Sequence, residues 1–151
     1  MKKIPLLAAF TIAFSCLTAR AFSQDLNPVI GTALDKLKEI EKTDHIIEKT
    51  LFDYIYKDNS SKYEYNYKFY VRHAYNISVV GDESQGENEN IKVYKIENGQ
   101  WKVIRIYKTV KMNSTVLFTP EETGTYNVEI SCTIKDNKDR ACVGLIIDRE
   151  N

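Results

Sequence analysis

Apolar and polar positions along the chain follow two different periods, and the first of them is helical. Over residues 27–45, apolar side chains recur every three or four positions while charged side chains take the opposite face. Asn27 can cap a helix, and Pro28 suits a first helical position. The pattern therefore predicts one amphipathic helix over about 27–45, with its apolar stripe packed on the domain's own sheet or on a partner. The stripe consists of Val29, Ile30, Ala33, Leu34, Leu37 and Ile40.

From residue 46 onward the period becomes two, which is typical of half-buried strands. Turn signals separate the runs, among them Asn98-Gly99, and the polar segment 82–90 lacks any period and predicts an exposed acidic loop. This spacing predicts a mainly β fold: an antiparallel, jelly-roll-like β-sandwich of about eight strands with one N-terminal helix. The expected strands are 46–56, 63–69, 70–80, 91–96, 101–108, 114–118, 126–134 and 141–148.

Residues 1–21 have the three parts of a secretory signal peptide. Two lysines precede an apolar run, and Ala19 and Ala21 supply the small residues before the cleavage point. The run is too short for a transmembrane helix, which needs about 20 apolar residues. We expect an exported protein, periplasmic or extracellular, with 22–151 as a single domain. Cys16 leaves open a second form, anchored to the membrane by a lipid on that cysteine.

Charge narrows the range of partners only slightly. The chain has 21 basic and 21 acidic residues, and removal of the signal leaves 18 against 21, a net charge of −3. This balance gives no support for binding to nucleic acid or to an anionic membrane surface. A protein or a glycan is the expected kind of partner.

The two cysteines that remain after signal cleavage predict a disulfide. Cys132 and Cys142 are the only pair in a chain expected to reach an oxidising compartment. A hairpin turn centred on Asn137 would place them opposite each other, within bridging distance. The alternative is two buried thiols.

Aromatic and acidic side chains supply the candidate binding residues. Tyr63, Tyr65 and Tyr67 share one strand face, which is either the core side of a sheet or an exposed platform for a glycan or protein. Trp101 follows a hairpin turn and is either a binding anchor or a packed residue. Asp82 and Glu83 offer oxygen ligands for calcium, although the spacing fits no EF-hand and a solvated loop is the alternative.

Catalytic motifs are missing from the sequence. His45 and His73 are the only histidines, and neither belongs to an H-E-x-x-H motif; G-x-S-x-G and a phosphate-binding glycine loop are also missing. The sequence therefore favours an exported, non-catalytic binding or interaction module. A structural or assembly component of the cell envelope and a hydrolytic enzyme are the alternatives.

Four segments together resemble bacterial pre-peptidase C-terminal domains, which are secreted β-sandwich modules. They are 75–81 (YNISVVG), 91–94 (IKVY), the turn 97–99 (ENG) and 115–130 (TVLFTPEETGTYNVEI). The last hairpin is also similar to that of Golgi-dynamics (GOLD) sandwich domains. The resemblance spans roughly 75–147 and implies a non-catalytic binding or chaperoning module, with calcium near Asp82 and Glu83. The chain departs from this family in its N-terminal helix, its tyrosine strands and the lack of an attached peptidase.

Overall fold

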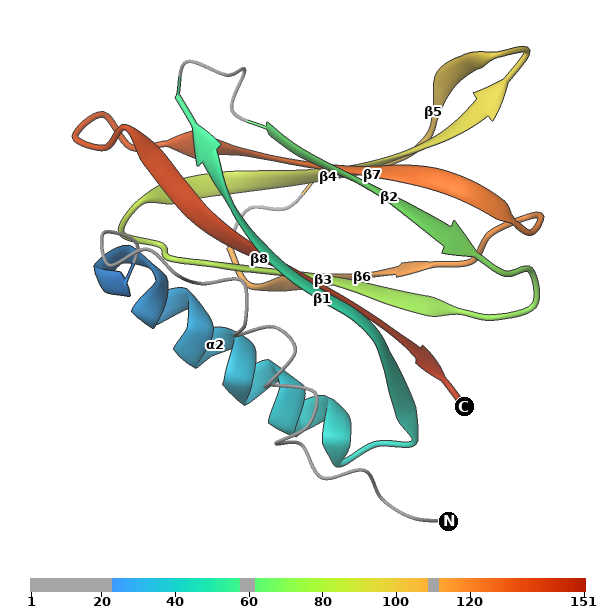
Figure 1. The fold of residues 1–151 in the computed structure, drawn as a ribbon, viewed down its shortest axis with the longest axis horizontal. Helices are drawn as coiled ribbons and strands as arrows, with labels where there is room; N and C mark the ends of the chain where they lie inside the picture. Colours follow the sequence, from blue (N-terminus) through green and yellow to red (C-terminus); the bar gives the residue numbers. More distant parts are fainter. Residues whose placement is uncertain (1–22, 58–61, 109–111) are drawn as a thin grey trace.

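The computed structural model describes residues 23–57, 62–108 and 112–151, which form one helix and a two-layered β-sandwich (Figure 1). The signal-peptide and Cys16 predictions fall outside these residues. The elements are α2 (Ser23–Glu41), β1 (His45–Tyr56), β2 (Lys62–Phe69), β3 (Tyr75–Gly81), β4 (Gly86–Glu97), β5 (Gln100–Lys108), β6 (Ser114–Phe118), β7 (Gly124–Ile134) and β8 (Arg140–Glu150).

The strands form two antiparallel four-stranded sheets in jelly-roll order. Sheet A has the order β1-β8-β3-β6 and sheet B the order β2-β7-β4-β5. The predicted fold class, a jelly-roll-like sandwich with an N-terminal helix, is confirmed. Among the connections between successive strands, only the β4–β5 hairpin stays within one sheet, while the others carry the chain to the opposite sheet. This hairpin projects beyond the sandwich, as Figure 1 shows.

The core between the sheets is built from alternate residues of each strand. Val79 and Ile77 of sheet A face Ile91, Val128 and their neighbours of sheet B, all of them buried. At one end Phe69 packs edge-on against Tyr75 and Phe118, with ring centroids 4.8 and 5.0 Å apart. Such T-shaped contacts stabilise aromatic clusters beyond the area that they bury.

Helix α2 covers the outer face of sheet A, as one of the two sequence alternatives proposed. Ala33 and Leu37 of its apolar stripe pack with Val80, Cys142 and Ile146 of the sheet. The helix begins at Ser23, so Pro28 lies inside it and the predicted cap at Asn27 is wrong. It also ends earlier than predicted, at Glu41, because the chain then turns into β1 and the backbone N–H of Thr43 donates to Ile40 O.

Two strand predictions are wrong in their bounds. The expected strand 70–80 begins only at Tyr75, because 70–74 carry the chain from sheet B to sheet A, with Arg72 at a φ of 75°. The expected loop 82–90 is shorter than predicted, since β4 already begins at Gly86, which pairs with Ile134. Polar side chains on this part of β4 hid the alternation on which the strand prediction depended.

The predicted disulfide is wrong, because Cys132 and Cys142 are both buried and no bridge joins them. The turn that was expected to close a hairpin instead carries the chain from β7 in sheet B to β8 in sheet A. Cys132 packs in the core between the sheets, whereas Cys142 faces α2 on the outer side of sheet A. The two side chains therefore belong to different cores, which prevents the opposed geometry that a disulfide requires.

Candidate binding surface

The predicted tyrosine stripe lines the core side of sheet B. Tyr63, Tyr65 and Tyr67 are partly buried and pack against the core between the sheets. The Tyr67 hydroxyl donates to Glu48 Oε2 at 3.1 Å, and burial together with this carboxylate raises the pKa of Tyr67 well above its usual range. Lys49 lies over the Tyr65 ring, 5.8 Å from its centroid. The stripe is thus a wall of the sandwich and not a flat exposed platform.

Trp101, by contrast, lies on the projecting β4–β5 hairpin. The turn is formed by Asn98 and Gly99 with φ angles of 54° and 77°, the left-handed pair that a type I′ hairpin requires. Trp101 therefore pairs directly with Ile96 on β4. Directly opposed residues of antiparallel strands share one face, so both side chains lie on the outer face of sheet B.

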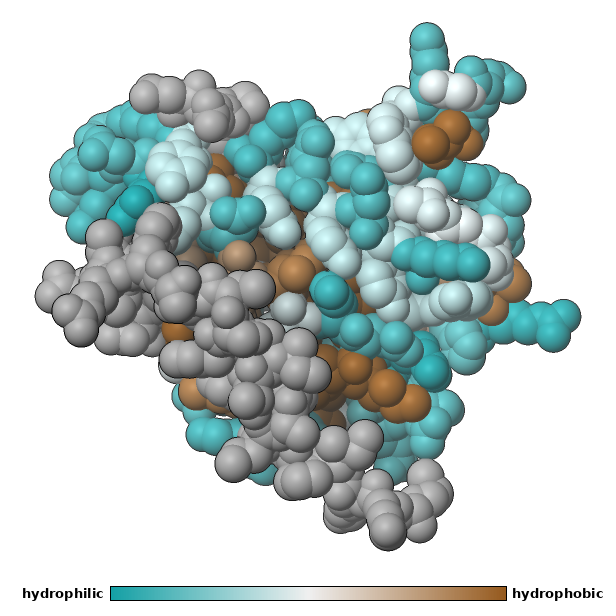
Figure 2. Space-filling model, viewed as in Figure 1, coloured by the Kyte–Doolittle hydropathy of each residue, from teal (hydrophilic) through white to brown (hydrophobic). Residues whose placement is uncertain are grey.

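Four exposed apolar side chains form a row on this outer face, which we call the apolar strip: Ile96, Trp101, Val103 and Ile106. Val103 pairs with Tyr94 and Ile106 with Lys92, so these side chains lie on the face that carries Trp101. Their exposed fractions are 50% for Ile96, 44% for Trp101, 38% for Val103 and 55% for Ile106. Figure 2 shows apolar surface on the projecting hairpin at the upper right, among hydrophilic neighbours.

A buried carboxylate fixes the side chains beside the strip. Glu129 of β7 accepts hydrogen bonds from Lys92 Nζ and from the Tyr94 hydroxyl, each at 2.8 Å, and Lys62 Nζ lies 3.6 Å away. Burial acts to raise the pKa of Glu129, but these hydrogen bonds and the two lysine charges outweigh it and hold the pKa below its ordinary value. The strip therefore adjoins an ordered polar network.

The strip lies at an edge of sheet B, since β4 is the one strand among the described residues that pairs with β5. Ile104 and Tyr107 anchor the inner side of β5 to the core, and the Tyr107 hydroxyl donates to Leu117 O at 2.8 Å. All the charged residues of β5 are basic: Lys102, Arg105 and Lys108. Lys102 Nζ bonds Glu97 Oε2 at 2.8 Å, whereas Arg105 and Lys108 form no ion pair with any residue that the structure describes.

A small hollow lies between α2 and the β3–β6 edge of sheet A. It holds about 200 Å³ and is lined by both hydroxyl and charged side chains, among them Thr32, Asp35, Lys36, Ser78 and Thr115. Ser78 and Thr115 hydrogen-bond to each other at 2.8 Å, but Ser114 Oγ is buried without a partner in the described part of the chain. The hollow is small beside ligand pockets, which typically hold about 300–1,000 Å³, so it offers little area to a ligand.

The two histidines lie apart from the apolar strip. His45 Nδ1 is 2.6 Å from Asp148 Oδ2, and Asn76 Nδ2 donates to the same carboxylate oxygen at 3.0 Å. No serine, threonine or cysteine side chain of the described ranges hydrogen-bonds this imidazole. The His73 ring packs edge-on against Tyr75. The first contacts connect β1, β8 and β3, whereas the His73 contact is local to the start of β3.

The candidate calcium residues take part in a turn. Asp82 Oδ1 accepts a hydrogen bond from the backbone N–H of Ser84 at 2.8 Å, and Lys135 Nζ donates to Glu83 O at 2.6 Å. Within residues 23–57, 62–108 and 112–151 no group of three or more histidine, cysteine or acidic side chains could hold a metal ion. The calcium site stays a prediction from the resemblance.

Sequence reasoning selected Trp101 but missed Ile96, Val103 and Ile106. The missed signal lies in β5, where Val103 and Ile104 and then Ile106 and Tyr107 are adjacent apolar residues. Such pairs place apolar side chains on both faces of a strand, so one face must be exposed unless something covers it. Helix α2 covers sheet A, and no described helix covers sheet B.

None of the helices in the described part of the chain is long and apolar enough to cross a membrane. No protein-family model matches the chain, and a search of curated proteins finds no match. The resemblance to pre-peptidase C-terminal and GOLD domains stays a prediction.

Proposed function

We propose that the protein is an exported, non-catalytic module that binds another protein through the apolar strip. The observation that supports this proposal is the alignment of four apolar side chains, each more than a third exposed, on one face of a projecting hairpin. Isolated apolar side chains are common on protein surfaces, but a contiguous row rimmed by charged residues is typical of an interaction site. The resemblance to secreted binding modules points in the same direction.

The composition of the strip favours a protein partner over a glycan. Ile96, Val103 and Ile106 are aliphatic, and Trp101 is the one aromatic side chain among the four. Glycan recognition relies on flat aromatic faces with polar side chains around them, and the tyrosines that could have supplied such faces are packed against the core. An exposed tryptophan among aliphatic side chains, with Arg105 on the same strand, instead fits protein–protein interfaces, in which tryptophan and arginine are enriched.

The enzyme alternative has less support. The closest approach to an acid–base pair is His45 with Asp148, and their hydrogen bonds are shared with Asn76 inside sheet A. The pair lies on the opposite layer of the sandwich from the apolar strip. An assembly role in the cell envelope is compatible with the same strip, because assembly also requires an exposed protein-binding surface.

Site-specific photo-crosslinking in the producing cells tests this proposal. A benzoylphenylalanine at Val103 is expected to give a discrete protein adduct that disappears when Ile106 is also replaced by aspartate. The matched control is the same probe at Asn66, an exposed residue on the outer face of the same sheet but outside the strip. Equal adducts from the two positions, or adducts that survive the Ile106 change, would contradict the proposal.

A further inference from the structure

We propose that the partner contributes an extended acidic segment that adds to β5 as a further strand of sheet B. This inference rests on the proposed function and specifies the chemistry of the partner. Three features of the hairpin support it: an open strand edge, a basic charge pattern and the apolar strip beside that edge.

The open edge supplies backbone hydrogen bonds. β5 is nine residues long, and β4 is the only described strand that pairs with it, so the amide and carbonyl groups on its other side join no ladder within the described part of the chain. Peptides that add to a sheet edge gain affinity from these main-chain bonds and specificity from alternate side chains. The contacts of Ile104 and Tyr107 with the core keep this edge in place, so little order has to be gained on binding.

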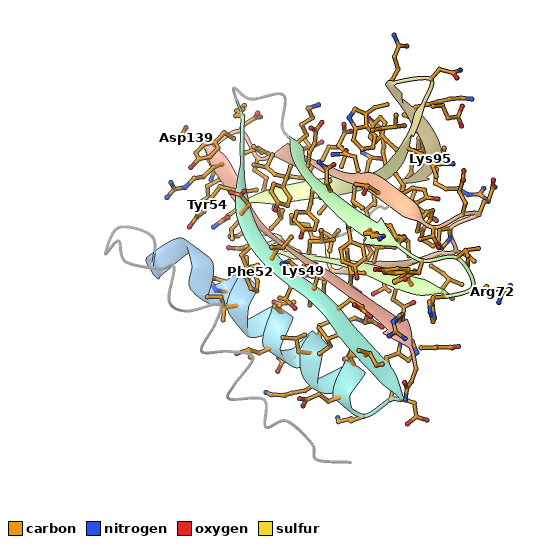
Figure 3. All side chains as sticks on the ribbon, turned by 45° about the vertical axis from the view of Figure 1, so that its right-hand side comes forward. Lys49, Phe52, Tyr54, Arg72, Lys95 and Asp139 are labelled. Atoms are coloured by element: carbon orange, nitrogen blue, oxygen red, sulfur yellow. The ribbon has the colours of Figure 1, made fainter. Side chains whose placement is uncertain are left out.

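The basic charge of the hairpin favours an acidic strand as the one that adds to β5. Residues 91–108 hold five basic side chains and one acidic, within a chain whose formal charge is zero. On β4, Lys92 is neutralised by Glu129 and Lys95 by Glu122. Figure 3 labels Lys95 on the hairpin. The edge strand β5 therefore carries the remaining positive charge, and carboxylates on an incoming strand would complement it.

The same charges argue against a second copy of this chain as the occupant. Pairing β5 with β5 would bring Lys102, Arg105 and Lys108 of one copy against the same three residues of the other. Like charges across a strand pair are destabilising. Lysines and bulges on an edge strand commonly prevent such self-association, and β5 has both, with a register shift opposite Val93 and Tyr94. An acidic partner turns this repulsion into attraction.

Alternation determines how the partner's side chains would lie. Successive residues of a strand point to opposite faces, so every second residue of the added strand lies beside Trp101, Val103 and Ile106 on the outer face. Apolar residues fit those positions, and acidic residues fit the positions beside Lys102 and Arg105, which lie on the other face of β5. The expected partner segment therefore alternates apolar and acidic side chains over about six to eight residues.

A synthetic peptide of four Glu-Val repeats tests the inference on the full mature chain. Trp101 is the only tryptophan, so its fluorescence reports on the strip itself. We expect the acidic peptide to shift the Trp101 emission to the blue and to slow exchange of the β5 amides that do not bond to β4 by about tenfold or more. We expect a rise from 50 to 500 mM salt to weaken binding, because charge attraction is screened.

Two matched controls test whether binding depends on the sign of the charge. Four Lys-Val repeats have the same apolar residues with the opposite charge and should give no shift with the native chain. The double variant Arg105→Glu and Lys108→Glu changes exposed side chains, so it should fold, and it should prefer the basic peptide.

The outcomes separate this inference from the proposed function. A blue shift of Trp101 without slower exchange at β5 would overturn strand addition, while binding at the apolar strip would stand. Equal binding of the acidic and basic peptides would overturn the acidic class of partner. If neither peptide binds, strand addition by this segment is wrong, and the Val103 crosslinks still decide whether the strip binds a protein.

Discussion

His45 Nδ1 lies 2.6 Å from Asp148 Oδ2 and joins the first residue of β1 to β8 across 103 positions of sequence. Asn76 of β3 donates to the same oxygen, so one carboxylate connects three neighbouring strands of sheet A. Asp148 is 1% exposed, and its second oxygen, Oδ1, has no partner among the described residues. This network holds the place where the chain leaves α2 and enters the sandwich.

The replacement Asp148→Ala is expected to destabilise the protein by about 2–4 kcal/mol, because it leaves the half-buried Asn76 amide and His45 ring without their acceptor. Urea unfolding followed by circular dichroism measures the loss. Asp136→Ala is the control, since its side chain is fully exposed, and it should change the free energy of unfolding by less than about 0.5 kcal/mol. Equal stability of the two variants would show that the network does not hold sheet A together.

Glu129→Gln should lower the free energy of unfolding by about 1–2 kcal/mol near neutral pH. The loss is modest because the lysine partners of Glu129 are partly solvated. The native pKa of Glu129 lies below its ordinary value, so the carboxylate stabilises the fold above an ordinary glutamate pKa of about 4.3. This contribution is lost as pH falls through the native pKa. The difference in unfolding free energy between wild type and variant should therefore shrink in acid. A difference independent of pH would indicate lost packing instead of lost charge.

Gly144→Ala should destabilise the protein by about 1–3 kcal/mol. An added Cβ would lie 2.7 Å from Val80 Cγ2 and 2.8 Å from Phe52 Cε1, on the side of sheet A that faces the helix (Figure 3). Gly31→Ala in α2 is the control, because nothing lies within 4 Å of its added Cβ, and it should stabilise the helix by about 0.5–1 kcal/mol. The melting temperature of each variant measures these changes. A Gly144 variant with the melting temperature of the wild type would contradict this packing.

Cys132 and Cys142 should react as thiols once the mature protein is unfolded without a reducing agent. Mass spectrometry after iodoacetamide treatment in denaturant should find two modified cysteines. Reductant should leave the denaturation midpoint unchanged. A chain that stays unmodified and is two hydrogens lighter than the dithiol form would show that the two cysteines form a disulfide.

Local pattern predicted the elements well and their partners poorly. Alternation at Tyr63, Tyr65 and Tyr67 identifies a strand, because side-chain direction depends only on the backbone period. The turn before Cys142 has the same polar composition whether it closes a hairpin or crosses between sheets, so the sequence could not decide the pairing of the cysteines. Trp101 and Ile106 are exposed only because no described helix covers sheet B, which is a property of the whole fold.

The two edge strands of sheet B allow the most direct test of the central claim, that the β4–β5 hairpin is the binding surface. Amide exchange of the full mature chain should be compared with and without the Glu-Val peptide, at β5 and at β2, the opposite edge of the same sheet. The account predicts slower exchange at β5, a blue-shifted Trp101 emission and unchanged exchange at β2. Protection at β2 alone, or equal protection of both edges with no change at Trp101, would contradict it.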